Sequence, residues 1–102
     1  MTYGLTYTAT APIEVYEAIH AEVLREQGDR PARGLLVHFA RPTATGFQLT
    51  EIWETREDLE AYNREVVDPV MQRLSAAGGA APPPPAVEEF EVHGLLLPTA
   101  VR

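Results

Sequence analysis

The strongest constraint on the fold is a strand followed at once by a helix in residues 46–67, GFQLTEIWETREDLEAYNREVV. Side chains along a strand alternate between its two faces, which predicts one shared face here. That face contains Phe47, Leu49, Glu51 and Trp53. A carboxylate and the only tryptophan of the chain are therefore expected on the same side of a sheet.

The helix of this unit is predicted to begin after Thr55. Thr55 and Asp58, three residues apart, form a weak capping box, and Glu57 suits the positive end of a helix dipole. The apolar residues that follow have helical spacing: Leu59, Tyr62, Val66 and Val67. An apolar stripe of this kind predicts that the helix packs back on the sheet.

Residues 49–59, LTEIWETREDL, resemble the E-x-W strand-to-helix signature of the antibiotic-biosynthesis monooxygenase-like superfamily. In the order of its elements, the resemblance extends over almost the whole chain. It implies a small ferredoxin-like protein that pairs as a dimeric α+β barrel. Many such proteins carry a histidine nine positions after that tryptophan, where this chain has Tyr62.

The composition excludes several classes of function. A net charge of −7 argues against nucleic acid and against anionic membranes as partners. The chain has no cysteine, and all eight of its basic residues are arginine, which excludes thiol nucleophiles and lysine Schiff bases. Its only serine, Ser75, lies where a helix is expected to end, so a serine-hydrolase triad is disfavoured. No signal-peptide pattern and no apolar run of membrane-spanning length is found, and we expect a cytoplasmic protein.

The other elements follow from the same periodicities. They are a strand at 2–8, a helix from Pro12 to Gln27, a strand at 34–41, a second helix broken at Asp68–Pro69, a Pro-rich connector at 82–85 and a last strand at 87–97. The order β-α-β-β-α-β predicts one ferredoxin-like α+β domain over residues 1–102, with an antiparallel sheet ordered 4-1-3-2 and both helices on one face. The bare face predicts a homodimer, as the resemblance also implies.

Proton-transfer chemistry is expected from three residues. His38 is preferred because its ordinary pKa lies near neutrality, and it is predicted to share a face with Leu36 and Ala40. Glu51 serves as a general base or orients a histidine. His93 in the last strand is the third candidate. The two strands lie at opposite edges of the sheet, so His93 is expected far from His38 of its own subunit, and it would approach His38 of a partner subunit if the edges join into a barrel.

A pocket between sheet and helices is expected to bind a small hydrophobic or aromatic molecule. Its predicted walls are Tyr7, Phe47, Trp53 and Tyr62, with Asn63 as a hydrogen-bonding group. His20 lies on the apolar stripe of the first helix. Two roles for it remain open there, a hydrogen-bonded core histidine and a catalytic histidine.

Several functions remain compatible with these residues. The resemblance implies cofactor-independent oxygenation, cyclisation or isomerisation of an aromatic or polyketide-like metabolite. A binding protein without catalysis would use the same pocket. Haem binding or degradation is a third possibility, and a zinc site from His38, Glu51 and His93 is a fourth.

Overall fold

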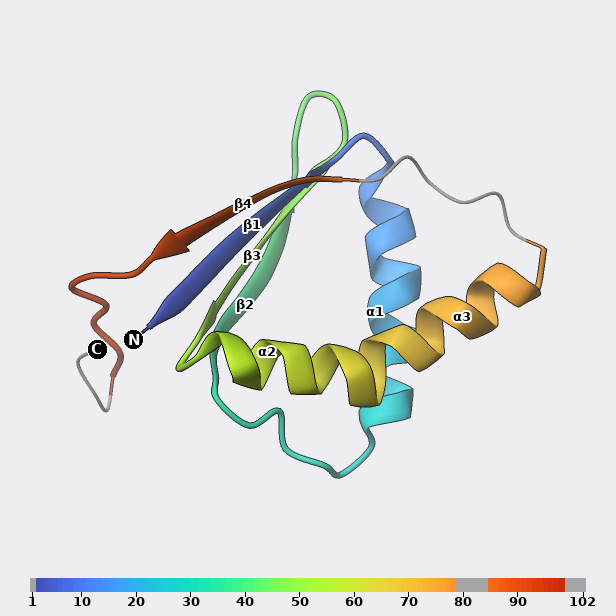
Figure 1. The fold of residues 1–102 in the computed structure, drawn as a ribbon. Helices are drawn as coiled ribbons and strands as arrows, with labels where there is room; N and C mark the ends of the chain where they lie inside the picture. The colour runs from blue at the N-terminus through green and yellow to red at the C-terminus, as the bar shows by residue number, and fades with distance from the viewer. Residues whose placement is uncertain (1, 79–84, 99–102) are drawn as a thin grey trace.

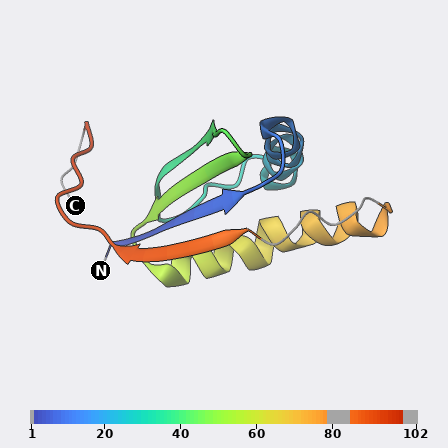
Figure 2. The same ribbon diagram turned by 90° about the horizontal axis from the view of Figure 1, so that it is seen from above.

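The computed structural model describes residues 2–78 and 85–98, and its elements follow the predicted order (Figure 1). They are β1 (Tyr3–Ala9), α1 (Ile13–Gln27), β2 (Leu35–Pro42), β3 (Phe47–Trp53), α2 (Arg56–Tyr62), the π-helical segment η1 (Asn63–Val67), α3 (Asp68–Ala76) and β4 (Ala86–Glu91). Seen from above, α1 is nearly end-on beside the sheet (Figure 2). Of the predicted connector, residues 82–84 lie outside the described residues.

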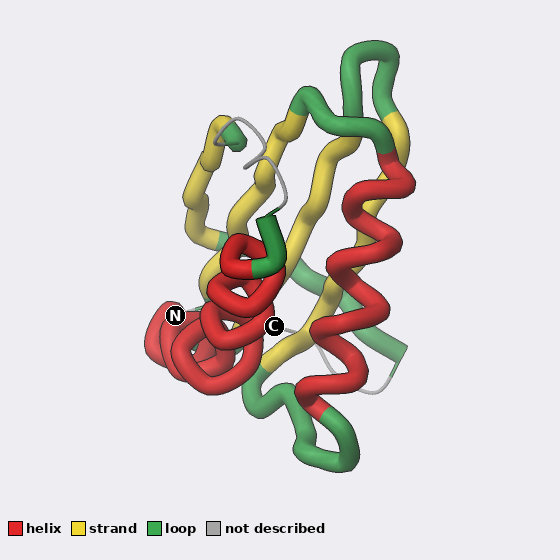
Figure 3. Tube along the Cα trace, turned by 90° about the vertical axis from the view of Figure 1, so that its right-hand side faces the viewer, coloured by secondary structure: helices red, strands yellow, loops and turns green. Residues whose placement is uncertain are grey.

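The four strands form one antiparallel sheet in the order β2-β3-β1-β4. This confirms the predicted α+β, ferredoxin-like arrangement. In the register of β1 and β3, Leu5 lies opposite Glu51 and Tyr7 opposite Leu49. The helices lie in front of this sheet when it is viewed from their side (Figure 3).

The pairing of β2 with β3 differs from the simple alternation expected from the sequence. A register shift lies between Leu35 and Val37, so that Leu35 pairs with Trp53 and His38 with Glu51. A β-bulge adds one residue to a strand and reverses the alternation on its far side. The prediction that Leu36 shares the face of His38 is therefore wrong, and Leu35 takes that place.

The predicted break at Asp68–Pro69 is replaced by a continuous, distorted helix. Asp68 keeps helical angles, with φ −61° and ψ −43°, and its N–H donates to the carbonyl of Asn63, five residues back. Pro69 has no N–H to continue an α-helical ladder, and a π-turn accommodates the missing bond. A smaller correction concerns Pro12, which is extended and precedes α1 instead of forming its first turn.

The last strand is shorter than the sequence predicts. β4 ends at Glu91, and the final backbone bond to β1 runs from the Val92 N–H to the Thr2 carbonyl, 3.1 Å away. β1 begins at Tyr3, so its ladder with β4 stops here, and Leu96 farther along forms an isolated β-bridge. Gly94 then turns the backbone at φ 68°.

The core lies between the sheet and α2. Leu5, Trp53 and Leu59 are buried together, and Tyr3, Tyr7, Leu35 and Tyr62 pack against them. The opposite face of the sheet is open, with Phe39 49% and Phe90 37% exposed. Among the described residues, no helix has the length and apolar character needed to cross a membrane.

The start of α2 depends on one capping bond, in which the Thr55 hydroxyl accepts from the Asp58 N–H at 3.1 Å. Replacing Thr55 by Ala should lower the free energy of unfolding by about 1 kcal/mol, because that N–H loses its partner. Urea denaturation followed by circular dichroism measures this change. Thr45→Ala, in the exposed turn before β3, is the control and should stay within about 0.5 kcal/mol of the unmodified chain. Equal effects of both substitutions would contradict the assignment of Thr55 as a cap.

Candidate functional site

A cavity of about 690 Å³ lies on the helix side of the sheet. It is enclosed by α1, by the segment from α2 to α3, and by β1, β2 and β3, and we call it the inner cavity. Its walls are mostly apolar, with residues such as Val15, Ile19, Val23 and Leu49. Figure 3 shows α1 and the α2–α3 helix in front of the strands, and residues from all of these elements line the cavity.

A chain of hydrogen bonds runs along one wall of the inner cavity. The Nδ1 atom of His38 lies 2.7 Å from Oε2 of Glu51, and its Nε2 atom lies 2.7 Å from the hydroxyl of Tyr16. The three side chains come from β2, β3 and α1. All three side chains line the cavity, so these hydrogen bonds are within reach of a bound molecule.

Glu51 is the one buried charged side chain among the described residues, with 8% exposure. A buried carboxylate is costly unless hydrogen-bond donors surround it. Beside His38, the indole Nε1–H of Trp53 donates to Oε1 of Glu51 at 3.3 Å. Trp53 is fully buried and holds the carboxylate by this bond, but it does not line the cavity, where the sequence predicted it as a wall residue.

The hydrogen-bond partners of His38 determine which of its ring nitrogens carries the proton when the imidazole is neutral. An ionised carboxylate only accepts, so the Nδ1 of His38 must carry the hydrogen that points to Glu51. Nε2 is then the unprotonated nitrogen and accepts from the Tyr16 hydroxyl. The imidazole therefore presents a proton acceptor on its cavity side, with an anion behind it.

His20 adds a second imidazole to this wall. Its ring stacks on Tyr16 and on His38, with ring centroids 5.2 Å apart in both pairs. Burial, and then the nearby His38, lower the pKa of His20 below its ordinary value. His20 is consequently held in its neutral form near neutral pH.

Sequence reasoning missed Tyr16 as a site residue and left His20 undecided. The available signal was their spacing: residues four apart lie on the same face of a helix, so Tyr16 and His20 had to face the same neighbour. What the sequence lacked was the position of α1 opposite His38, which only the tertiary structure gives.

The other predicted site residues separate into two groups, the predicted binding residues and the predicted catalytic His93. Tyr7, Phe47, Tyr62 and Asn63 line the inner cavity. His93 does not, since its side chain is 80% exposed and lies 3.5 Å from Glu91 at the opposite edge of the sheet. The structure thus brings His38 and Glu51 together within one subunit and leaves His93 apart from them.

The tyrosines around the cavity keep their protons at neutral pH. Burial raises the pKa of Tyr7, Tyr16 and Tyr62, and the charge of Glu51 raises each of them further. All three hydroxyls are therefore neutral hydrogen-bonding groups.

Within residues 2–78 and 85–98, no three histidine or carboxylate side chains are grouped so that they could hold a metal ion. His38 and Glu51 are bonded to each other, and His93 is distant from both. The zinc hypothesis from the sequence therefore finds no ligand set in one subunit.

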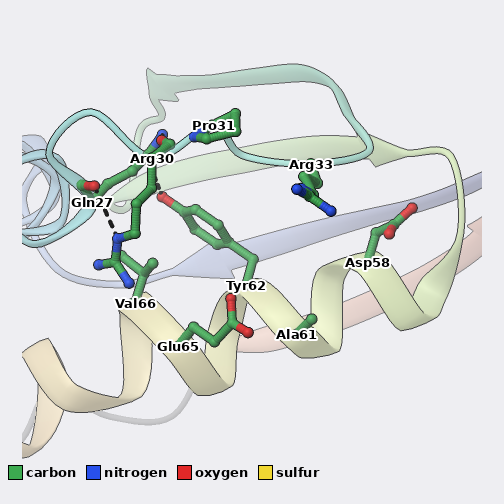
Figure 4. Close-up of a pocket in the computed structure, with 9 residues that line it drawn as sticks. All are labelled: Gln27, Arg30, Pro31, Arg33, Asp58, Ala61, Tyr62, Glu65 and Val66. Carbon is green, nitrogen blue, oxygen red and sulfur yellow. Dashed lines mark hydrogen bonds between the residues drawn. The ribbon is translucent and has the colours of Figure 1, made fainter.

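A second, outer cavity of about 440 Å³ adjoins the first (Figure 4). It lies between the loop after α1 and the α2 helix. Its walls carry charges of both signs: Arg30, Arg33, Asp58 and Glu65. Two residues, Gln27 and Tyr62, line both cavities.

Comparison with known proteins gives structural relatives. No protein-family model and no curated sequence matches the chain. A provisionally named antibiotic biosynthesis monooxygenase from Chloroflexus aurantiacus is similar in structure, with a TM-score of 0.61, 22% identity, and coverage of 93% of this chain and 97% of that one. SnoaB from Streptomyces nogalater, a cofactor-independent oxygenase, has a TM-score of 0.56 at 14% identity, with 95% of each chain covered.

A third relative is the monooxygenase from the gene ActVA-Orf6 of Streptomyces coelicolor, solved with the ligand nanaomycin D. Its TM-score is 0.50 at 16% identity, with 95% of this chain and 90% of that chain covered. At such identities the likeness establishes the fold. It confirms, at that level, the resemblance to antibiotic-biosynthesis monooxygenase-like proteins.

The lowered pKa of His20 makes stability depend on pH. Since the unfolded chain binds a proton at this residue more readily than the folded one, the free energy of unfolding should fall as pH drops from about 7.5 to about 5. Replacing His20 by Phe removes the titrating group and should reduce that fall. Urea denaturation at a series of pH values measures it. Ile19→Val on the same helix is the control, expected to lower stability by about 1 kcal/mol equally at each pH. Parallel pH curves for His20→Phe and the unmodified chain would refute the assignment.

Proposed function

We propose that this chain is a cofactor-independent enzyme that removes a proton from an aromatic or polyketide-like molecule held in the inner cavity. The observation that carries the proposal is the position of His38, hydrogen-bonded to Glu51 on one side and to Tyr16 on the other within the cavity wall. The fold shared with monooxygenase-like proteins, SnoaB among them, supports the same class of chemistry.

The chemistry begins with an acidic C–H or phenol O–H of the substrate. Its proton passes to Nε2 of His38, either directly when the substrate displaces the Tyr16 hydroxyl or through that hydroxyl. Glu51 stabilises the imidazolium that forms, because its negative charge lies 2.7 Å from Nδ1. Trp53 holds the carboxylate in place from the buried side.

The substrate anion then has two possible fates. With dioxygen, a methylene flanked by aromatic rings gives a carbonyl, one oxygen atom entering the substrate and the other leaving as water. The substrate supplies the electrons in that case, so the protein contributes only the base and a largely apolar cavity that holds the substrate beside it. Without dioxygen, reprotonation or attack of the anion at another carbon gives isomerisation or cyclisation.

Replacing His38 by Ala should lower kcat for a hydroxylated anthrone by about 10²-fold or more, since the proton acceptor is lost. Product formation is followed by absorbance under air and under argon, which separates oxygenation from rearrangement. His93→Ala is compared in the same assay. Because His93 lies outside the cavity of its own subunit, an equal loss there would mean that it acts from a partner subunit.

Two results of this assay would contradict the proposal that His38 is the base of an enzyme. One is unchanged turnover in the His38→Ala variant. The other is ligand binding by both proteins with no conversion of any phenol or anthrone in a broad panel, which would favour the alternative of a non-catalytic binding protein. Titration with haemin, followed in the Soret region, tests the haem alternative on the same samples.

We also propose that the chain forms a homodimer through the open face of its sheet. Phe39 and Phe90 are exposed on that face together with the partly exposed Val37 and Ile52. Burying this surface against a second copy would remove apolar area from water. A soluble monomer rarely leaves such a contiguous patch uncovered.

The dimer predicts a clear effect of a charge placed on this face of the sheet. Phe39→Asp should raise the dissociation constant of the dimer at least tenfold, because an unpaired carboxylate would be buried, and light scattering after size exclusion measures the mass. Val87→Asp is the control, since Val87 is 53% exposed but lies opposite Tyr7 on the helix side of the sheet. A monomeric unmodified chain, or equal effects of both substitutions, would refute this interface.

A further inference from the structure

The inner and outer cavities meet at two side chains, those of Tyr62 and Gln27. Tyr62 extends from the end of α2 toward the C-terminal end of α1, where its hydroxyl donates to Oε1 of Gln27 at 2.7 Å (Figure 4). These are the two residues that line both spaces. Tyr62 and Gln27 therefore form a wall that the two spaces have in common.

The phenol ring of Tyr62 is held in this position mainly by packing. It lies 5.5 Å from the indole of Trp53 between ring centroids, at an angle of 48°, and it joins the edge of the buried core. A single neutral hydrogen bond adds little to this on balance. The ring itself, more than its hydroxyl, closes the inner cavity at this end.

The outer cavity differs from the inner one in its chemistry. Its charged side chains are two arginines and two carboxylates, so hydrogen-bond donors and acceptors are present without a net charge. Arg30 is fixed by bonds to the carbonyls of Glu26 and Gln27, which end α1. Such walls suit a neutral hydrogen-bonding group, for example a hydroxyl or an amide, better than an anion.

We infer that Tyr62 sets the length of the ligand, by closing an elongated binding space that continues into the outer cavity. The ligand is a fused aromatic ring system that occupies the inner cavity. Tyr62 prevents a neutral polar substituent on the terminal ring of this ligand from extending into the outer cavity. This inference rests on the proposed function for the ring system, but it concerns selectivity in binding and does not depend on turnover.

The test compares two probes, a dihydroxyanthraquinone and the same compound carrying a hydroxypropyl chain on its terminal ring. Affinities of the purified full chain are measured by fluorescence quenching. Tyr62→Ala should shift the affinity ratio in favour of the longer probe by roughly tenfold, because the chain carbon atoms gain burial in the opened space. Tyr62→Leu, which keeps apolar packing against the core, should shift it in the same direction and serves if the alanine variant does not fold.

Tyr62→Phe is the matched control, because it removes the bond to Gln27 and keeps the ring. Its affinity ratio should stay within about twofold of the unmodified chain. An unchanged ratio in the Leu variant, an equal shift in the Phe variant, or no binding of either probe to any variant overturns the inference. A shifted ratio with no turnover in any variant would refute the proposed enzyme and leave the inference standing.

Discussion

The buried carboxylate of Glu51 is the constraint on which the site depends. A charge at 8% exposure must be surrounded by donors, and the structure supplies the indole of Trp53 and the imidazole of His38. Meeting this requirement fixes the register of β2 against β3, since His38 has to lie opposite Glu51. It also fixes the tautomer of the histidine, and through it the orientation of the proton acceptor toward the cavity.

The helices determine how much space surrounds that acceptor. The π-turn before Pro69 keeps α2 and α3 in one helix, with Asn63 and Val67 from this turn facing the inner cavity. Ion pairs of Arg73 on α3 with Glu26 and Glu22 on α1 join the two helices on their outer side. The helices are thus linked at the surface while their inner faces remain apart, which preserves a space of about 690 Å³.

Much of the architecture could be predicted from periodicity. The alternation in β3, the apolar stripe of α1, and the β-α-β-β-α-β order were sufficient for the sheet order and for the shared face of Glu51 and Trp53. The wrong predictions concern two places where the same local sequence pattern is compatible with two structures. One residue inserted at Leu36 reversed a face, and Pro69 distorted the helix where the sequence pattern indicated a break.

The sequence by itself determined the residue types of the site and placed His38 and Glu51 on adjoining strands, because strand pairing follows from order and alternation. Only the tertiary structure decided that Tyr16 and His20 face them from α1, that Trp53 lies beneath the acid, and that Tyr62 divides two cavities. The physical reason is that helix packing distances and angles depend on the sum of many side-chain contacts, which no short stretch of sequence encodes.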